Sequence, residues 1–242
     1  MPRESPTFSP LYRQIKSLIG RALESGEWRP GAPIPSEVEL AQRYSVSQGT
    51  VRKAIDEMAA ENLLVRRQGK GTYVASHSDP RTRFRFLRLT PNSGSITAPV
   101  SVPLECLRAK AGQEVARVLG VEPGAPVILI RRLLKFEGHP TVVDEIYLRG
   151  EAFPGLTLAM LREDHRSLYS LFETRFGVRM VRAEERLRAV AADRGSADLL
   201  GVPEGTPLLS VERIAYSYAD KAMEWRRGLY RTTDHFYMNE LS

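Results

Sequence analysis

The stretch that decides the fold of the first part of the chain covers residues 35–58 and reads PSEVELAQRYSVSQGTVRKAIDEM. Ser36 and Glu39 have the S-x-x-E spacing of a capping box, which predicts that a short helix begins there. Ser47 is expected to cap a second helix, in which apolar residues recur at i, i+3, i+4 and i+7 from Val51 to Met58. Two helices joined by so short a turn are typical of a helix-turn-helix.

The start of the second predicted helix carries polar side chains on its outer face, namely Gln48, Thr50, Arg52 and Lys53, and Gly49 keeps that surface low. Free backbone N–H groups and the positive end of the helix dipole favour nearby phosphates. A recognition helix presents side chains of this kind to base edges. The pattern therefore indicates DNA binding; a small helical bundle with a solvated face is the alternative.

A third helix is predicted before this stretch. Ser9 is a possible N-cap, Pro10 suits the first helical position, and Gly26 lies where the helix should end. The face expected to point inward holds Leu11, Ile15, Leu18, Ile19, Ala22 and Leu23.

Two short β-segments, residues 63–67 and 72–74, follow the second helix of the pair and flank the sequence QGKG at 68–71. A basic, glycine-tipped hairpin directly after a recognition helix is typical of a wing. Its backbone at Gly69 can approach a narrow minor groove closely, and Lys70 can neutralise phosphate.

Over residues 8–75 these motifs resemble the winged-helix domain of the GntR family of bacterial transcription regulators. The resemblance rests on PxPSE at 33–37, TVRKA at 50–54, ENLL at 61–64 and QGKGTYV at 68–74. It implies that the recognition helix enters the major groove and that the wing-tip glycine lies in the minor groove. The residues expected at the DNA are Ser36, Ser47, Gln48, Gly49, Thr50, Arg52, Lys53, Gln68, Gly69 and Lys70.

Two positions depart from the family pattern. Val38 and Gln48 stand where many members have an arginine that helps to read bases. Arginine commonly recognises guanine, whereas glutamine suits adenine. The operator preference is therefore expected to be shifted from the usual one.

The distribution of charge points to the same half of the chain. The 242 residues carry a net charge of +6, and basic and acidic residues number 11 and 9 in 1–80, 4 and 0 in 81–95, and 20 and 20 in 96–242. The surplus suggests a polyanionic partner. With 42% hydrophobic and 26% charged residues, the composition excludes disordered, collagen-like and disulfide-scaffold proteins.

Residues 76–95 are expected to be a basic linker between a DNA-binding domain at 1–75 and a second domain at 96–242. The segment contains Pro80 and Pro91, and the alternation RFRF at 83–86 gives it some strand character. Its arginines are Arg81, Arg83, Arg85 and Arg88. They either add sequence-independent attraction to phosphate or belong to a solvated linker.

The expected location is the cytoplasm, with no membrane partner. The N-terminus has no apolar h-region, and no stretch approaches 18 uninterrupted apolar residues. The single cysteine, Cys106, has no partner for an internal disulfide and no companion at metal-ligand spacing.

The second domain contains a repeated unit. LGVxxGxP at 119–126 recurs at 200–207, an offset of 81 residues that places Arg132 opposite Arg213. Each copy, over 116–148 and 197–231, is predicted to be a helix, a Gly-Pro turn and a β-hairpin whose second strand ends in a tyrosine. We therefore expect an α+β domain in which the two hairpins form one antiparallel sheet with helices on a face.

Over residues 95–238 this pattern resembles the UTRA effector-binding domain of the HutC-type branch of GntR regulators, whose fold is related to chorismate lyase. The motifs are the Gly-x-Pro turn at 124–126, DExYL at 144–148, SLY at 167–169 and EWR at 224–226. The effector-binding residues that the resemblance implies are Arg132, Glu145, Ser167, Tyr169, Arg226 and Tyr230. Leu134 stands at a position that is often a second arginine, which disfavours a strongly anionic ligand such as a sugar phosphate.

Structural roles remain open for several of these residues. Arg132 and Glu145 could form an ion pair across the hairpin, and Ser167 could be an N-cap, which is compatible with anion binding. Asp144 is expected to be solvated on its strand. The residues expected in the core are Trp225, Phe236 and Cys106.

Catalytic residues, metal ligands and cofactors are not predicted, because the histidines lie at no metal-ligand spacing and no G-x-S-x-G occurs. The primary hypothesis is a dimeric, non-enzymatic repressor that a small-molecule effector releases from a palindromic operator in double-stranded DNA. The alternatives are an enzyme or sensor of chorismate-lyase-like fold with a DNA-binding appendage, and a nucleoid-type protein without specificity.

Overall fold

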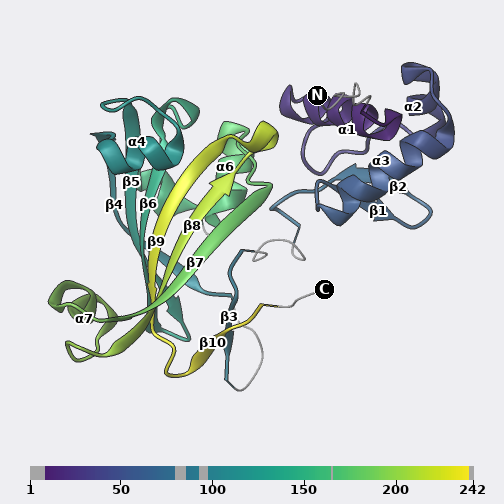
Figure 1. Ribbon diagram of the computed structural model, residues 1–242. Helices are drawn as coiled ribbons and strands as arrows, with labels where there is room; N and C mark the ends of the chain where they lie inside the picture. The colour runs from purple at the N-terminus through teal and green to yellow at the C-terminus, as the bar shows by residue number, and fades with distance from the viewer. Residues whose placement is uncertain (1–8, 80–85, 93–97, 165, 240–242) are drawn as a thin grey trace, which may run out of the picture. The chain divides into compact units, whose positions relative to one another are not determined.

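The computed structural model describes residues 9–79, 86–92, 98–164 and 166–239, and the chain divides into two compact units, Met1–Asp79 and Pro80–Ser242 (Figure 1). The linker residues Arg81, Arg83 and Arg85, and with them most of the predicted alternation at 83–86, lie outside the described residues. Within the described ranges, no helix is long and apolar enough to cross a membrane.

The first unit is a three-helix domain with a β-hairpin. Its elements are α1 (Leu11–Glu24), α2 (Glu37–Tyr44), α3 (Gln48–Ala60), β1 (Leu64–Arg67) and β2 (Gly71–Val74). The two strands pair antiparallel, and Pro33 adds a bridge to Tyr73. The buried side chains that join the helices include Ile15, Ile19, Leu40, Val51, Ile55 and Met58. The predicted helix-turn-helix and hairpin are confirmed.

Both predicted helix caps are present. The Ser36 side chain accepts the Glu39 N–H at 3.3 Å, while the Glu39 carboxylate accepts the Ser36 N–H at 2.7 Å. Ser47 accepts the Thr50 N–H at 3.2 Å. These short side chains satisfy N–H groups that would otherwise lack partners in the first turn. The sequence pattern therefore located the starts of α2 and α3 correctly.

The start of α1 differs from the prediction. Pro10 rather than Ser9 is the N-cap, because the Pro10 carbonyl accepts the first hydrogen bond of the helix, from the Arg13 N–H at 2.9 Å. Leu11 was expected on the buried face but is 58% exposed.

The second unit is built on one six-stranded antiparallel sheet with the strand order β4-β5-β6-β9-β8-β7. The strands are β4 (Val100–Lys110), β5 (Pro126–Phe136), β6 (His139–Arg149), β7 (Arg182–Ala191), β8 (Pro207–Tyr216) and β9 (Ala222–Tyr230). The helices are α4 (Gln113–Leu119), α5 (Leu158–Glu163), α6 (Leu168–Phe176) and α7 (Arg194–Leu200), with short 3-10 turns η1 (Gly150–Ala152) and η2 (Tyr218–Asp220).

The predicted repeat is confirmed and is longer than its sequence match. Each half of the sheet runs strand, helix, strand, strand, as β4-α4-β5-β6 and β7-α7-β8-β9, and the halves meet where β6 pairs with β9. Gly120 and Gly201 end the two helices with φ of 61° and 65°. The edge strands β4 and β7 belong to the repeat although their sequences do not match.

Helices cover both faces of the sheet, whereas the sequence predicted helices on one face. Because strand side chains alternate between faces, Tyr147 and Trp225 pack with α4, while Ile146 and Leu148 pack with Tyr169 of α6. We call these the α4 face and the α6 face. α7 covers the α4 face through contacts with Val143 and Leu229, among others.

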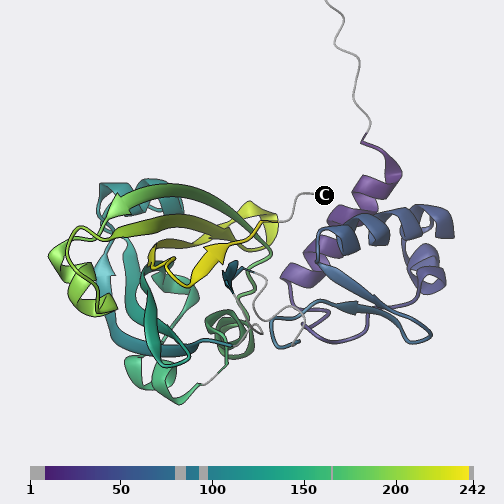
Figure 2. The same cartoon turned by 90° about the horizontal axis from the view of Figure 1, so that it is seen from below.

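A small ribbon lies on the α6 face, where β3 (Leu89–Pro91) pairs antiparallel with β10 (His235–Tyr237) (Figure 2). Leu89 and Tyr237 pack into a core with Tyr230. The predicted core position of Phe236 is wrong: its side chain is 44% exposed, because alternation along β10 turns it away from Tyr237. The ribbon ties the beginning of the second unit to its C-terminal segment.

Candidate functional site

The polar surface predicted to contact DNA is organised by one carboxylate, that of Glu37 at the start of α2. It accepts hydrogen bonds from Arg52 Nε at 2.9 Å, from Arg66 Nη2 at 2.9 Å and from Gln48 Nε2 at 3.2 Å. Burial opposes ionisation, but the hydrogen bonds from Arg66, Arg52 and Gln48 lower the pKa of Glu37. Glu37 therefore stays charged and holds these three side chains on one surface.

The other predicted residues of the recognition helix have varied surroundings. The Ser47 and Thr50 hydroxyls lie 2.9 Å apart and satisfy one another at the helix start. Lys53 lies over the ring of Tyr12 of α1, with the ammonium 4.1 Å from the ring centre, rather than beside Gln48 and Arg52. A Cβ on Gly49 would meet only the Ser47 hydroxyl, at 3.9 Å, so packing within this unit does not require glycine there.

The wing places its tip on the same side as Glu37. Gly69 and Gly71 have φ of 68° and 97°, the left-handed region that favours glycine. A groove of about 430 Å³ lies between α2, α3 and the hairpin. It is lined by residues that include Ser36, Glu37, Gln48, Arg66, Gln68 and Gly69. The sequence did not single out Glu37 or Arg66, because their roles depend on this three-dimensional arrangement.

The second candidate site is a pocket of about 430 Å³ on the α6 face of the sheet. Four of the six predicted effector residues line it, namely Arg132, Ser167, Tyr169 and Arg226, and Arg213 joins them. Ser167 caps α6 by accepting the Ser170 N–H at 3.2 Å. The pocket therefore has an arginine-rich floor beside the start of a helix.

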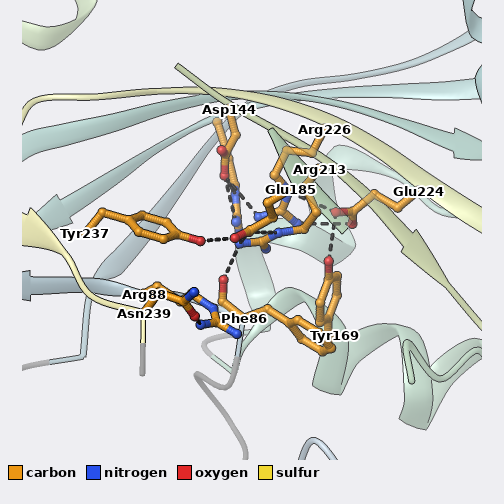
Figure 3. Close-up of polar contacts among 11 residues, drawn as sticks. Phe86, Arg88, Asp144, Tyr169, Glu185, Arg213, Glu224, Arg226, Tyr237 and Asn239 are labelled. Carbon is orange, nitrogen blue, oxygen red and sulfur yellow. Dashed lines mark hydrogen bonds and ion pairs between the residues drawn. The ribbon is translucent and has the colours of Figure 1, made fainter. Parts of the chain in front are cut away.

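Buried ion pairs position the arginines of the floor (Figure 3). Arg132 donates from Nε to Asp144 Oδ2 at 2.9 Å, and its Nη2 forms an ion pair with the same oxygen at 2.8 Å. Arg226 donates from Nη1 to the same oxygen at 3.3 Å, and from Nε and Nη2 to the Glu224 carboxylate at 2.9 Å and 3.1 Å. The Tyr169 hydroxyl donates to Glu224 at 2.8 Å. Strands β5, β6 and β9 are thus joined to α6.

Arg213 connects the pocket to the first residues of the second unit. It donates from Nε to Glu185 at 2.6 Å and from Nη2 to the backbone carbonyl of Phe86. The Phe86 ring packs edge-on against Tyr169, with the ring centres 5.4 Å apart. Glu185 also accepts a hydrogen bond from the hydroxyl of Tyr237 on β10. Phe86 is the first described residue after Asp79, so this end of the linker forms part of the pocket wall.

The buried groups have distinct protonation states. Burial opposes ionisation of Asp144, but Arg226 and Arg132 lower its pKa. Burial raises the pKa of Tyr169 well above its usual range and that of Tyr230 to about 12. The pKa of Arg132 is lowered because its burial outweighs the attraction of Asp144. At neutral pH the carboxylate is therefore charged and both phenols are neutral.

Two predictions about the first hairpin are wrong. Arg132 pairs with Asp144 and not with Glu145, and Asp144 is 0% exposed rather than solvated. Glu145 points to the α4 face, where it accepts hydrogen bonds from Arg131 at 3.1 Å and from Tyr147 at 3.0 Å. The motif showed that two acids follow one another but not which of them faces the pocket. A shift of one residue exchanges the faces of a strand.

Tyr230 does not line the pocket either. Its side chain is buried in a core with Leu134 and Val142. Tyr147 and Tyr230, which the repeat match equated, lie on opposite faces of the sheet. The register pairs Arg132 with Asp144 and Arg213 with Arg226, so the equivalent positions differ by one from the sequence match.

Several functional candidates escaped the sequence prediction. Glu224, Glu185 and Phe86 became visible only through the pairing of distant strands. Arg213 had a signal, because the repeat offset placed it opposite Arg132. Trp225 is buried, as predicted, whereas Cys106 is only half-buried on β4. Within the described part of the chain, no group of three or more His, Cys, Asp or Glu side chains could hold a metal ion.

Two family models match the chain. The model described as "Bacterial regulatory proteins, gntR family" matches residues 11–74, and the UTRA domain model matches residues 98–235. The transcriptional repressor NagR of Bacillus subtilis is 28% identical over 249 residues, which cover 99% of this chain and 98% of that protein. The transcriptional repressor PhnF of Mycolicibacterium smegmatis is 30% identical over 91% of this chain and 88% of its own length.

Solved structures agree with these matches. The ligand-binding domain of a protein described as a GntR-family transcriptional regulator from Bordetella bronchiseptica is 49% identical, with a TM-score of 0.62 over 64% of this chain and 97% of that one. The crystal structure of PhnF from Mycobacterium smegmatis is 28% identical, with a TM-score of 0.55 over 94% of this chain and 99% of that one.

Proposed function

The chain belongs to the gntR family of bacterial regulatory proteins and carries a UTRA domain, and we propose that this DNA-binding, effector-binding transcriptional regulator is a repressor. NagR and PhnF, which match it over most of its length, are both named as repressors. The observation that carries the proposal is the presence in one chain of a polar recognition helix and a separate, arginine-floored pocket.

The proposed DNA contacts lie on the recognition helix and the wing. Glu37 holds Gln48 and Arg52 at the outer surface, which reduces the side-chain entropy lost when they meet bases. Gln48 is proposed to recognise adenine, and the wing tip to enter the minor groove. The full proposed set is Ser36, Ser47, Gln48, Gly49, Thr50, Arg52, Lys53, Gln68, Gly69 and Lys70.

A homodimer on a palindromic operator is the proposed assembly. One recognition helix covers only a few base pairs, whereas two related by a two-fold axis recognise two half-sites separated by whole turns of DNA. The measurement is the stoichiometry of the complex: two chains for each duplex are expected. A single chain that binds at full affinity to an isolated half-site would contradict it.

The proposed effector site is the α6-face pocket. The residues offered to the ligand are Arg132, Ser167, Tyr169, Arg213 and Arg226. Glu145 and Tyr230 are not carried into this site, because one lies on the opposite face and the other below the pocket, in the core. Pockets of roughly 300–1,000 Å³ are usual for small-molecule sites, which suits a small metabolite.

The proposed route from effector to DNA passes through Phe86. Its carbonyl accepts a hydrogen bond from Arg213, and its ring contacts Tyr169. A ligand that binds either residue therefore competes with the contacts that keep Phe86, at the end of the linker, in place. A ligand shifts an equilibrium only by its difference in affinity for the two states. In the proposed route, the two states differ in whether Phe86 contacts Arg213 and Tyr169, so a ligand that displaces Phe86 binds one state more tightly than the other.

The experiment uses the full chain and DNA selected from a random library. Fluorescence anisotropy gives the affinity for the selected site and for a scrambled site at the same salt concentration, since salt strongly affects both. Tight binding to the selected site alone, weakened by a metabolite that is recovered unchanged, supports an effector-released repressor. Equal affinity for both sites would contradict sequence-specific binding.

A further inference from the structure

The ionisable groups below the pocket balance one another. Three arginines, Arg132, Arg213 and Arg226, pair with three carboxylates, those of Asp144, Glu185 and Glu224. The phenols of Tyr169 and Tyr230 are neutral at pH 7, because burial raises the pKa of each. The floor of the pocket is therefore rich in guanidinium groups without carrying a net formal charge.

Two of the three guanidinium groups, those of Arg132 and Arg213, keep a hydrogen-bond donor that a ligand can use. Among the described residues, Arg132 uses Nε and Nη2 for Asp144, and Arg213 uses the same two nitrogens for Glu185 and Phe86. Both arginines line the pocket, and none of these hydrogen bonds and ion pairs uses their Nη1 groups, which are therefore left to donate to an anion. Burial outweighs the attraction of Asp144 and lowers the pKa of Arg132, so a nearby anion would stabilise that guanidinium further.

Among the lining residues that the structure describes, the rest of the wall offers little additional positive charge. Leu134 lies two residues beyond Arg132 on the same face of β5, and Val100, Leu161 and Leu168 extend the apolar surface. At the rim, Arg166 is paired with Asp164 at 2.5 Å. Arg162 is exposed, so water and salt screen its charge.

We propose that the effector is an organic monoanion, a carboxylate on an apolar body, bound between Arg132 and Arg213 with its body against Leu134 and Leu168. This assignment rests on the proposed function of the pocket. One carboxylate matches the two unused donor groups. A phosphate monoester carries about −1.5 to −2 charges at pH 7, and its second charge would enter a site whose cations are already neutralised, at a cost in desolvation.

The test uses ligands that share an apolar body and differ in charge. Isothermal titration of the full chain compares phenylacetate with phenethyl alcohol and phenyl phosphate, and octanoate with octanol and octyl phosphate. In each of the two series in which any ligand binds, we expect the carboxylate to bind most tightly. At least one of the two carboxylates should bind with a Kd below about 1 mM. A phosphate that binds more tightly than its matched carboxylate, or the failure of both carboxylates to bind, would overturn the proposal.

Variants that add one positive charge to the pocket sharpen the test. One variant is Leu134→Arg, and the other is Ser101→Arg, at the exposed position of β4 that pairs with Leu134. Each should raise the affinity for the phosphate relative to the carboxylate by about tenfold, as one added charge-assisted hydrogen bond would. Leu134→Met is the control for volume and should leave the preference for the carboxylate unchanged. If Leu134→Arg fails to fold, Ser101→Arg still tests the proposal. An unchanged ratio of phosphate to carboxylate affinity in Ser101→Arg counts against the proposal.

Failure of this assignment and failure of the proposed function give different results. A carboxylate that binds the pocket but leaves DNA affinity unchanged supports the ligand class and contradicts effector control. A phosphate monoester that binds best and releases the DNA contradicts the ligand class and supports effector control.

Discussion

Asp144 is the residue at which the two halves of the sheet are joined electrostatically. It lies on β6, and its Oδ2 accepts hydrogen bonds from Arg132 of its own hairpin and from Arg226 of the other. Its Oδ1 is buried without a hydrogen-bond partner among the described residues and lies against Gly228. Without this carboxylate, both guanidinium groups would lose a counter-charge in a site that excludes water.

We therefore predict that Asp144→Asn lowers the free energy of unfolding by about 3–5 kcal/mol, the usual result of removing one partner of a buried ion pair. Urea denaturation of the full chain measures it. The folded-state pKa of Asp144 is lowered, so its contribution is present above the unfolded pKa of about 3.9 and is lost as pH falls through the folded pKa.

Glu145→Gln is the matched control, since the residue is next in sequence and faces the other side of the sheet in a more exposed cluster. A loss in Asp144→Asn no larger than in this control would contradict the assigned role of Asp144.

Gln48 is one of the two positions at which the sequence departs from the family pattern and specificity is expected to differ. Gln48→Ala should relax discrimination at one base position in each half-site by about 1–3 kcal/mol, because the amide that pairs with adenine is lost. Binding-site selection followed by sequencing measures this. Gln42→Ala, at an exposed glutamine of α2 outside the proposed set, should leave the selected sequence unchanged. Unaltered discrimination in Gln48→Ala would exclude this role.

At the scale of elements, β9 is closely packed between two strands of the second unit. It pairs with both β6 and β8, and its inward side chains include Glu224, Arg226 and Tyr230. Gly228 lies between them, and a Cβ there would come within 2.5 Å of the Tyr230 ring and 2.9 Å of Asp144 Oδ1. The glycine allows the carboxylate and the phenol to pack beside the strand.

Gly228→Ala is accordingly expected to destabilise the chain by about 1–3 kcal/mol through overpacking. Thermal unfolding measures the change. Gly195→Ala in α7 is the control, because its Cβ would make only an ordinary contact at 3.7 Å and alanine favours helix. Equal stability of the two variants would show that β9 can move to accommodate a side chain.

The elements could be predicted from the sequence because their signals are local. The capping box placed α2, and the LGVxxGxP repeat placed two helix ends and the hairpins that follow. The ion cluster could not be predicted in the same way. Its pairs Arg226–Asp144 and Arg213–Glu185 depend on which strands are neighbours and on their register. The predicted register of the first hairpin was wrong by one residue, which assigned Glu145 to the wrong face of the sheet.

At the scale of the molecule, the central question is how the pocket communicates with the recognition helix. Phe86 connects the pocket to the linker through its carbonyl and its ring. Phe86→Leu removes the ring contact with Tyr169 and retains the carbonyl. We expect this variant to bind DNA and effector separately but to show a smaller effect of one on the other, measured as the ratio of DNA affinities with and without effector. An undiminished ratio would exclude the ring of Phe86 from the route.

The most direct test of effector control measures both directions of coupling in the full chain. The affinity for the selected operator is determined with and without a saturating amount of the tightest-binding carboxylate, and the affinity for that carboxylate with and without operator. Thermodynamic linkage requires equal factors, and a weakening of about 5–150-fold in both is predicted. A carboxylate that binds the wild-type pocket, fails to bind Arg132→Met and leaves operator affinity unchanged would contradict the account.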